Sequence, residues 1–359
     1  MPDKINVVFC IDTSYVQQLG ATLASLFMHN EAKKLKVFIV SPPLDPCDLM
    51  KLESIGQTFG GDMVFSQAED ERISGFREHL HISRATYYRL LLPEIFSDVD
   101  KFIYLDCDLV VEADLRELWD TDIATCGCAG VDQENSPDAN RLGLHPDFYI
   151  NAGILLLNLS YWRANNIMEK CLDWLVENPQ KAVMLEQDAI NVILRERKAK
   201  IDLKWNLNPA PYPDLGILKQ YPSRILHFAG SLKPWHKYYD FDLQAIYRKY
   251  VDLTPWSGEF LPQEPRNAGQ ACLVANQLYK RNDFLAACTY YQQTINFKLK
   301  TDNLDSKLLL DCINGGHRHF NSQDYVSACE HYRSCIEHWG YPVYYDSVYR
   351  MPGTLDGMY

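Results

Sequence analysis

Two aspartates are the side chains of this sequence best placed for metal chemistry. Asp106 and Asp108 flank Cys107 directly after the apolar run 101–105 (Lys-Phe-Ile-Tyr-Leu). Side chains two residues apart in an extended chain point to the same face, so the two carboxylates can share one hard divalent cation. Mg²⁺ or Mn²⁺ held in this way keeps open positions for substrate phosphates and neutralises a diphosphate leaving group. A solvated turn is the alternative interpretation of such a short string.

A second polar segment follows a short apolar run much later in the chain. His227 stands near the end of the run 224–228, and Gly230 and Lys233 follow it closely. A glycine lets backbone approach a phosphate, and a lysine supplies a point charge to it. This segment therefore indicates a phosphate and metal site. A lone histidine in an apolar run is also typical of a packed core residue, and that alternative stays open.

Both segments must be positioned by the elements that precede them. Strand-like and helix-like patterns alternate from residue 5 onward. We expect strands over 5–11, 35–40, 62–65, 101–105, 148–159 and 224–228, and helices over 15–28, 48–59, 84–92 (ended by Pro93), 161–176 and 186–195. This alternation predicts an α/β layered sheet with right-handed crossovers. Ligands gather at the carboxyl ends of such strands, so Asp12, after the first strand, is a further candidate.

A proline-rich segment and an internal repeat mark the second half of the chain. Residues 254–266 contain three prolines and are the expected linker, and the pattern beyond them is helical. Residues 282–295 match 323–336 at an offset of 41 residues (324 − 283). The matched pairs are Asp283 and Asp324, Phe284 and Tyr325, Ala287 and Ala328, Cys288 and Cys329, Tyr291 and Tyr332, and Ile295 and Ile336, with Ala275 and Gly316 upstream.

The small and aromatic positions of this repeat resemble tetratricopeptide helix pairs, whose usual period is about 34 residues. Two such units rarely bury a core alone, so we expect them to pack on the first domain, on each other in a homodimer, or on a protein partner. A generic helical cap is the alternative. The predicted division is an α/β domain over 1–253, the linker 254–266, a helical domain over 267–345 and a tail over 346–359.

Composition excludes several classes of protein. Lys plus Arg is 35 and Asp plus Glu is 47, so the net charge is 35 − 47 = −12 and nucleic acid is not an expected partner. No apolar run reaches the length of a transmembrane segment, and the N-terminus lacks the layout of a signal peptide. The eleven cysteines are odd in number and scattered, which predicts free thiols in a reducing compartment. We expect a cytoplasmic location, at most peripheral at the inner face of the membrane.

Six segments together resemble the retaining glycosyltransferases of family 8, which include bacterial lipopolysaccharide galactosyl- and glucosyltransferases and glycogenin. They are 7–15 (Val-Val-Phe-Cys-Ile-Asp-Thr-Ser-Tyr), 86–90 (Thr-Tyr-Tyr-Arg-Leu), 104–110 (Tyr-Leu-Asp-Cys-Asp-Leu-Val), 149–153 (Tyr-Ile-Asn-Ala-Gly), 186–191 (Glu-Gln-Asp-Ala-Ile-Asn) and 227–235 (His-Phe-Ala-Gly-Ser-Leu-Lys-Pro-Trp). The resemblance spans about residues 5–250. It implies a nucleotide-sugar-binding GT-A-type domain with one central mixed sheet, followed by a small all-α domain.

The resemblance also implies a role for each matching position. Asp106, Asp108 and His227 would bind Mn²⁺ (or Mg²⁺), and Cys10, Asp12, Ser14 and Tyr15 would line the uridine pocket, with Tyr15 stacked on the base. Arg89 would contact the donor sugar or phosphate, and Asn151 would contact sugar hydroxyls. Gly230 and Lys233 would bind the diphosphate, and Cys107 and Ala152 would make further contacts with the donor. Two positions near the expected uridine pocket depart from the family, which often has Asn at Ser14 and Asp at Thr13.

Ordinary structural roles are the alternatives for several of these residues. Asn151 can satisfy backbone in a buried strand, Arg89 can form a surface ion pair, and Tyr15 can be the first core residue of its helix. Glu186, where relatives commonly carry Asp, can be a helix-start carboxylate that the helix dipole favours. Trp235, Tyr238 and Tyr239 either wall the acceptor site or pack in the core.

The resemblance places Glu186 and Gln187 beside the anomeric carbon of the donor. A double displacement needs a nucleophile there, and because the Gln187 amide is a poor one, Glu186 or Asp188 would have to swing in. In the second route, a front-face reaction, the departing phosphate deprotonates the acceptor. We favour that route, in which the metal and Lys233 stabilise charge on the leaving group.

The implied function is that of a metal-dependent hexosyltransferase of class EC 2.4.1. It would move galactose or glucose from a UDP-hexose to a glycan, lipopolysaccharide or glycoprotein acceptor. A catalytically weak scaffold that acts through its helical repeats in protein–protein contacts is one alternative, and a nucleotide-sugar hydrolase is another. Release of UDP in the presence of Mn²⁺ separates the transferase from the scaffold.

Overall fold

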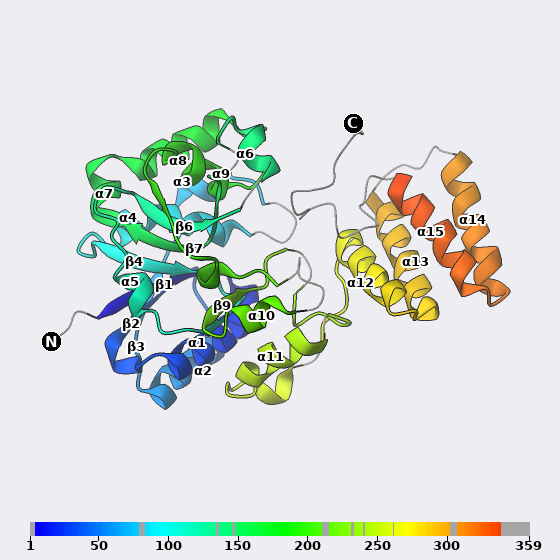
Figure 1. The fold of residues 1–359 in the computed structure, drawn as a ribbon, viewed down its shortest axis with the longest axis horizontal. Helices are drawn as coiled ribbons and strands as arrows, with labels where there is room; N and C mark the ends of the chain where they lie inside the picture. Colours follow the sequence, from blue (N-terminus) through cyan, green and yellow to red (C-terminus); the bar gives the residue numbers. More distant parts are fainter. Residues whose placement is uncertain are drawn as a thin grey trace. The chain divides into compact units, whose positions relative to one another are not determined.

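The computed structural model describes residues 4–78, 83–133, 136–145, 148–209, 215–230, 233–239, 241–260, 262–301 and 307–338. The chain forms two compact units, which contain its α/β part and its helical part (Figure 1). The first unit consists of residues 1–229 and 247–259, and the second consists of residues 230–246 and 260–359.

A seven-stranded mixed sheet forms the centre of the first unit, which confirms the central mixed sheet that the family resemblance implied. Its strands, in spatial order, are β3 (Asp62–Gln67), β2 (Leu35–Ser41), β1 (Ile5–Cys10), β4 (Lys101–Leu105), β7 (Ile150–Asn158), β6 (Cys128–Asp132) and β8 (Lys198–Lys200). Only β7 runs antiparallel to its neighbours β4 and β6. The carboxyl ends of the other six strands therefore meet at one edge of the sheet, beside the start of β7.

A two-stranded antiparallel ribbon lies outside this sheet and joins distant parts of the chain. It pairs β5 (Leu109–Glu112) with β9 (Arg224–His227), and its register sets His227 opposite Leu109. Leu109 directly follows Asp108, so the ribbon brings His227 to the aspartate pair across 118 residues of sequence (227 − 109).

Helices cover both faces of the central sheet (Figure 1). One face packs on α1 (Val16–His29) and α2 (Pro46–Phe59); the other packs on α4 (Tyr88–Ile95), α7 (Leu159–Ala164), α8 (Ile167–Glu177) and α9 (Glu186–Ile193). Because side chains alternate along a strand, Val7 joins the core on the α1 side and Val8 joins the core on the α4 side. Burial on both faces explains the continuous apolar run of β1.

The other elements that precede α12 are η1 (Thr13–Tyr15), η2 (Ala32–Lys34), α3 (Glu71–Ser74), η3 (Arg84–Tyr87), α5 (Arg116–Trp119), α6 (Pro137–Arg141), η4 (Leu203–Asn206), α10 (Ile217–Gln220), α11 (Phe241–Val251) and η5 (Ser257–Glu259). Across the described ranges, no helix combines the length and the apolar character that crossing a membrane requires.

Two predicted helices differ from the structure. Pro93 was expected to end a helix, but α4 runs through Pro93 to Ile95. Proline has no N–H, so one backbone hydrogen bond is missing in the last turn of α4. Because Leu90 and Leu92 of α4 are fully buried, packing stabilises the helix despite this loss. The single helix predicted over 161–176 is divided into α7 and α8, because Asn166 adopts a left-handed φ of 53° between them.

Four helices form two hairpins in the second unit. They are α12 (Ala268–Lys280), α13 (Phe284–Thr301), α14 (Lys307–Asn321) and α15 (Tyr325–His338), and they lie in the order α12, α13, α15, α14 (Figure 1). The two hairpins meet through their second helices at equivalent repeat positions. The Sγ atoms of Cys288 and Cys329 are 3.2 Å apart.

Each of these thiols also donates to a carbonyl at the start of the facing helix. Cys288 donates to the Tyr325 carbonyl (3.3 Å), and Cys329 donates to the Phe284 carbonyl (3.4 Å). These reciprocal contacts relate the hairpins by an approximate two-fold axis. The tetratricopeptide-like assignment stays a prediction.

The segment before α11 belongs to the second unit and pairs with the residues before α12. The Gln263 N–H donates to the Trp235 carbonyl (2.8 Å), and the Lys237 N–H donates to the Gln263 carbonyl (2.8 Å). One crossing between units, after Glu259, falls inside the predicted linker 254–266, whereas residues 230–246 lie outside the predicted helical domain. The predicted domain limits stay predictions, and the tail 346–359 lies outside the described residues.

His236 predicts a pH-dependent stability for the second unit. Burial, together with the nearby charges of Lys233 and Arg266, lowers the pKa of His236 to about 4, and its Nδ1 accepts the Lys233 N–H (3.0 Å). The folded pKa lies below the ordinary value of 6.5, so the unfolded state binds the extra proton and stability is lost as the pH falls from about 6.5 toward 4. We expect a loss of about 1–2 kcal/mol between about pH 7 and pH 5.

Denaturant unfolding at these two pH values measures the loss. The matched control is His236→Asn, which keeps an acceptor for the Lys233 N–H but does not titrate in this range, and it should lose less stability than the parent. An NMR titration that gives His236 its ordinary pKa would contradict the prediction.

Candidate functional site

The three predicted metal ligands converge at the carboxyl edge of the central sheet. Asp106 follows β4, Asp108 precedes β5, and His227 ends β9. One ligand atom from each side chain lies within 4.8 Å of the other two. The His227 Nε2 atom is 3.4 Å from Asp108 Oδ1 and 3.9 Å from Asp106 Oδ2. The structure therefore brings together the side chains that the sequence analysis assigned to a metal.

A chain of hydrogen bonds fixes which nitrogen of His227 faces the aspartates. The Gly153 N–H donates to Asn151 Oδ1 (2.9 Å), and Asn206 Nδ2 donates to the same oxygen (2.9 Å). Asn206 Oδ1 then faces His227 Nδ1 at 2.8 Å. Because an amide oxygen only accepts, the proton of His227 lies on Nδ1, and the lone pair of Nε2 points toward the cluster.

At Gly153 the backbone of β7 passes directly beside this cluster. A Cβ atom there would lie 2.2 Å from His227 Cε1 and 2.8 Å from Asp106 Oδ2. The Gly153 carbonyl also accepts the Asp106 N–H (2.7 Å). Glycine is required here because any side chain would displace two of the three ligands.

The three predicted metal ligands have the chemistry that suits a divalent cation. Two carboxylates supply the hard oxygen ligands that Mg²⁺ and Mn²⁺ prefer, and a neutral imidazole adds a nitrogen ligand. A metal-binding histidine usually forms a hydrogen bond through its other ring nitrogen, and this bond orients the imidazole. Asn206 is the partner of His227 in such a bond.

Arg89 is a buried cation that holds one of the aspartates. Its guanidinium donates to the Ala152 carbonyl (2.5 Å) and to Asp106 Oδ1 (2.9 Å), and the Tyr104 hydroxyl donates to that same oxygen (2.6 Å). Burial alone would lower the pKa of Arg89, but the acidic groups of Tyr104 and Asp106 raise it overall. Arg89 therefore orients Asp106, and its predicted contact with the donor stays a prediction.

Gln187 and Asp188, at the start of α9, are both held by hydrogen bonds. Gln187 accepts the Ala152 N–H (2.9 Å) and donates to the Tyr149 hydroxyl (3.0 Å). Asp188 is fully buried and accepts from the Tyr149 hydroxyl (2.6 Å) and from Arg141 (2.9 Å). Burial raises the pKa of Asp188, although these donors favour its charged form.

Glu186 differs from its two neighbours because one of its oxygens is unsatisfied. The side chain is buried, and its Oε1 accepts the Thr86 hydroxyl and lies 3.4 Å from Arg89 Nε. Its Oε2 has no hydrogen-bond partner among the described residues. Burial raises the pKa of Glu186. An unpaired buried oxygen costs about 1–3 kcal/mol, so Oε2 is positioned to accept from a ligand.

The residues predicted for the uridine pocket follow β1 at the same edge. Cys10 is buried, which raises the pKa of its thiol. Asp12 Oδ1 accepts the N–H (2.8 Å) and the hydroxyl (2.6 Å) of Ser14, and so caps η1. Burial raises the pKa of Tyr15, and the charge of Asp108 raises it further. Their contacts with a base stay predictions.

The remaining predicted residues are distributed over both units. Cys107 is buried, and its carbonyl accepts the Thr22 hydroxyl (2.9 Å). Gly230 has a φ of 100°, a left-handed conformation that favours glycine. Gly230 and Lys233 belong to the second unit, and their predicted role at the diphosphate stays a prediction.

Sequence reasoning missed the residues that support the ligands. An isolated glycine inside a strand pattern signals a close approach of backbone, so Gly153 was detectable. Asn206, Thr86 and Tyr149 carry no such signal, because their roles depend on contacts with residues far away in sequence.

The chain is similar to known glycosyltransferases. The model of the family described as "Glycosyl transferase family 8" matches residues 6–238. General stress protein A of Bacillus subtilis is 29% identical over 271 residues, which cover 70% of this chain and 95% of that protein. Lipopolysaccharide 1,3-galactosyltransferase of Salmonella typhimurium is 25% identical over 304 residues, which cover 80% of this chain and 90% of that protein. The crystal structure of the galactosyltransferase LgtC with donor and acceptor sugar analogues superposes with a TM-score of 0.60 at 24% identity, over 71% of this chain and all of that one.

The hydrogen bond from His227 predicts a metal-affinity effect for a residue that is not a ligand. Replacing Asn206 with Leu removes the acceptor for His227 Nδ1, so the imidazole loses its orientation. We expect the affinity for Mn²⁺ to fall by about 10- to 100-fold. Titration of the purified variants with Mn²⁺, followed by electron paramagnetic resonance, measures it.

Asn206→Asp keeps an acceptor for the proton on His227 Nδ1 but loses the donor to Asn151 Oδ1, so its affinity should fall between those of the parent and Asn206→Leu. Equal affinities for parent and Asn206→Leu would contradict the assigned tautomer.

Proposed function

Because the chain belongs to glycosyl transferase family 8, we propose that it transfers a hexose, galactose or glucose, from a UDP-sugar to a glycan acceptor. The observation that carries this proposal is the convergence of Asp106, Asp108 and His227 at one edge of the sheet. The relative from Salmonella typhimurium, by its name, acts on lipopolysaccharide, which supports a lipopolysaccharide or similar glycan as the acceptor.

We propose Mn²⁺ or Mg²⁺ as the ion that these three residues hold. When bound, the ion would act as a Lewis acid toward the diphosphate leaving group. The protein's own contribution is orientation: Asn206 keeps the proton of His227 on Nδ1, and Arg89 holds Asp106 Oδ1 so that Oδ2 faces the cluster.

The hydrogen bonds of α9 support a front-face reaction that retains the anomeric configuration. A covalent intermediate would need a carboxylate free to move to the sugar. Asp188 is held by Tyr149 and Arg141, and the amide of Gln187 is bonded at both of its ends. Glu186 is held through Oε1, which accepts from Thr86 and lies 3.4 Å from Arg89 Nε. In the front-face route the acceptor proton passes to the departing phosphate, and Glu186 Oε2 accepts a hydroxyl of the donor sugar.

The metal cluster predicts the effect of one neutralised ligand. Asp108→Asn removes a negative oxygen ligand, so UDP release from a UDP-sugar in the presence of Mn²⁺ should fall at least about 100-fold while the thermal unfolding temperature stays close to that of the parent. A screen of UDP-sugars for UDP release, in the presence of glycan acceptors, provides the measurement.

Asp120→Asn, at an exposed carboxylate that pairs only loosely with Arg116 (3.8 Å), is the control and should keep full activity. Unchanged turnover in folded Asp108→Asn protein would refute the metal assignment. A parent protein that releases no UDP from any UDP-sugar would instead favour the scaffold.

The unsatisfied oxygen of Glu186 predicts a selective loss of donor affinity. Glu186→Gln exchanges an acceptor for a donor, so the affinity for the UDP-sugar should fall about tenfold while the affinity for UDP, which has no sugar, stays the same. Calorimetry with both ligands measures the two affinities. Glu186→Asp keeps the carboxylate and is the control. Equal losses for UDP and UDP-sugar would show that Glu186 acts only on the fold.

A further inference from the structure

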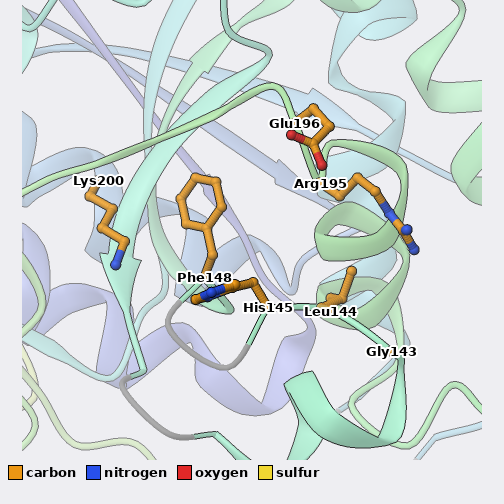
Figure 2. A pocket seen from close by; sticks show the side chains of 7 residues that line it. All are labelled: Gly143, Leu144, His145, Phe148, Arg195, Glu196 and Lys200. Carbon is orange, nitrogen blue, oxygen red and sulfur yellow. The ribbon is translucent and has the colours of Figure 1, made fainter.

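A cavity of about 570 Å³ opens in the first unit (Figure 2). It is lined by Gly143, Leu144, His145, Phe148, Arg195, Glu196 and Lys200. None of these residues belongs to the predicted metal, uridine or donor-sugar sets.

The cavity lies at the same edge of the central sheet as the metal cluster. Lys200 ends β8, and Phe148 stands just before β7, which begins at this edge. Strand β8 is three strand intervals from β4, or about 14 Å at roughly 4.8 Å per interval. A second substrate that reaches from the cluster to the cavity would therefore extend along the edge.

Basic side chains outnumber acidic ones around the cavity, although the chain as a whole is acidic. His145, Arg195 and Lys200 line it, whereas Glu196 is its only acidic lining residue. Lys200 pairs with Asp132 (2.7 Å). The side chain of Arg195 has no hydrogen-bond or ion-pair partner among the described residues, and Figure 2 shows its guanidinium on the side of the cavity away from Phe148.

Two ammonium groups hold the aromatic wall of the cavity. The Nζ atoms of Lys198 and Lys200 lie 4.7 Å and 5.6 Å from the centroid of the Phe148 ring. Lys198 is buried beneath the ring and donates to the Phe148 carbonyl (2.8 Å) and to Asn191 Oδ1 (2.9 Å). These contacts fix both the ring and its backbone, so the ring offers a rigid apolar face to a ligand.

The floor of the cavity is continuous with the start of α9. Leu144 is buried in a small apolar cluster with Tyr149. The Tyr149 hydroxyl bonds both Gln187 and Asp188. Leu144, which lines the cavity, therefore packs in one cluster with the side chain that positions these two residues.

We propose that this cavity binds an anionic group of the acceptor, a phosphate or a carboxylate on a sugar ring that packs against Phe148. This inference rests on the proposed transferase function, since it assigns the cavity to the second substrate. Arg195 supplies the charge that recognises the anion, and Phe148 supplies apolar contact to the ring. Phosphate and carboxylate share this chemistry, and the experiment distinguishes them.

The test measures binding of three sugars to the full-length chain without a donor: glucose 6-phosphate, glucuronate and methyl glucoside. Saturation-transfer NMR and calorimetry at low salt should show that at least one anionic sugar binds about tenfold or more tightly than the neutral one. The preferred anion identifies the group. Arg195→Glu should abolish this preference.

Arg197→Glu is the matched control, because Arg197 is exposed, lies two residues away and does not line the cavity. It should bind the anionic sugar like the parent, and thermal unfolding checks that both variants fold. Equal binding of all three sugars would overturn the proposal, as would an Arg195→Glu variant that keeps the preference. These results would overturn the anion site alone. Failure of the proposed transferase function would instead be seen as a parent chain that releases no UDP from any UDP-sugar.

Discussion

The candidate metal site depends on a chain of hydrogen bonds whose direction cannot be reversed. It begins at the Gly153 N–H, which can only donate, and passes through the amides of Asn151 and Asn206 to His227 Nδ1. Asn151 must therefore present its oxygen to both the Gly153 N–H and Asn206 Nδ2, so Asn206 presents its own oxygen to His227 and the imidazole proton lies on Nδ1. A backbone group thus decides the state of a side chain that would otherwise have two tautomers.

This chain can form only because the fold joins three distant segments at one sheet edge. The antiparallel strand β7 starts at the edge where β4 ends, so Gly153 and Asp106 lie side by side. The β5–β9 ribbon then sets His227 beside Asp108. Arg89, from α4, holds Asp106 from below the edge through burial and charge. The sheet therefore supplies rigid positions, and loops immediately after its strands supply the chemistry.

The sequence predicted what local patterns control. The runs that became β1, β2 and β4 are apolar and short, and the aspartates after β4 stand out at once. The predictions of a mixed sheet and of His227 beside those aspartates rested on the family resemblance. No local sequence pattern indicates that β7 is antiparallel or that β9 pairs with β5. Asn206 was missed for the same reason. Two helix predictions were wrong. The helix continues through Pro93 because packing outweighs the propensity of proline to end a helix, and the helix predicted over 161–176 is interrupted by the left-handed residue Asn166.

The reciprocal contact between Cys288 and Cys329 limits how the helical unit can grow. In a solenoid each repeat offers its successor a fresh surface, so repeats can be added without end. A pair of hairpins joined through an approximate two-fold uses the same face of each partner, and that face is consumed once the pair has formed. The two copies, at an offset of 41 residues (329 − 288), therefore form a closed pair through this contact, which a third copy could not repeat.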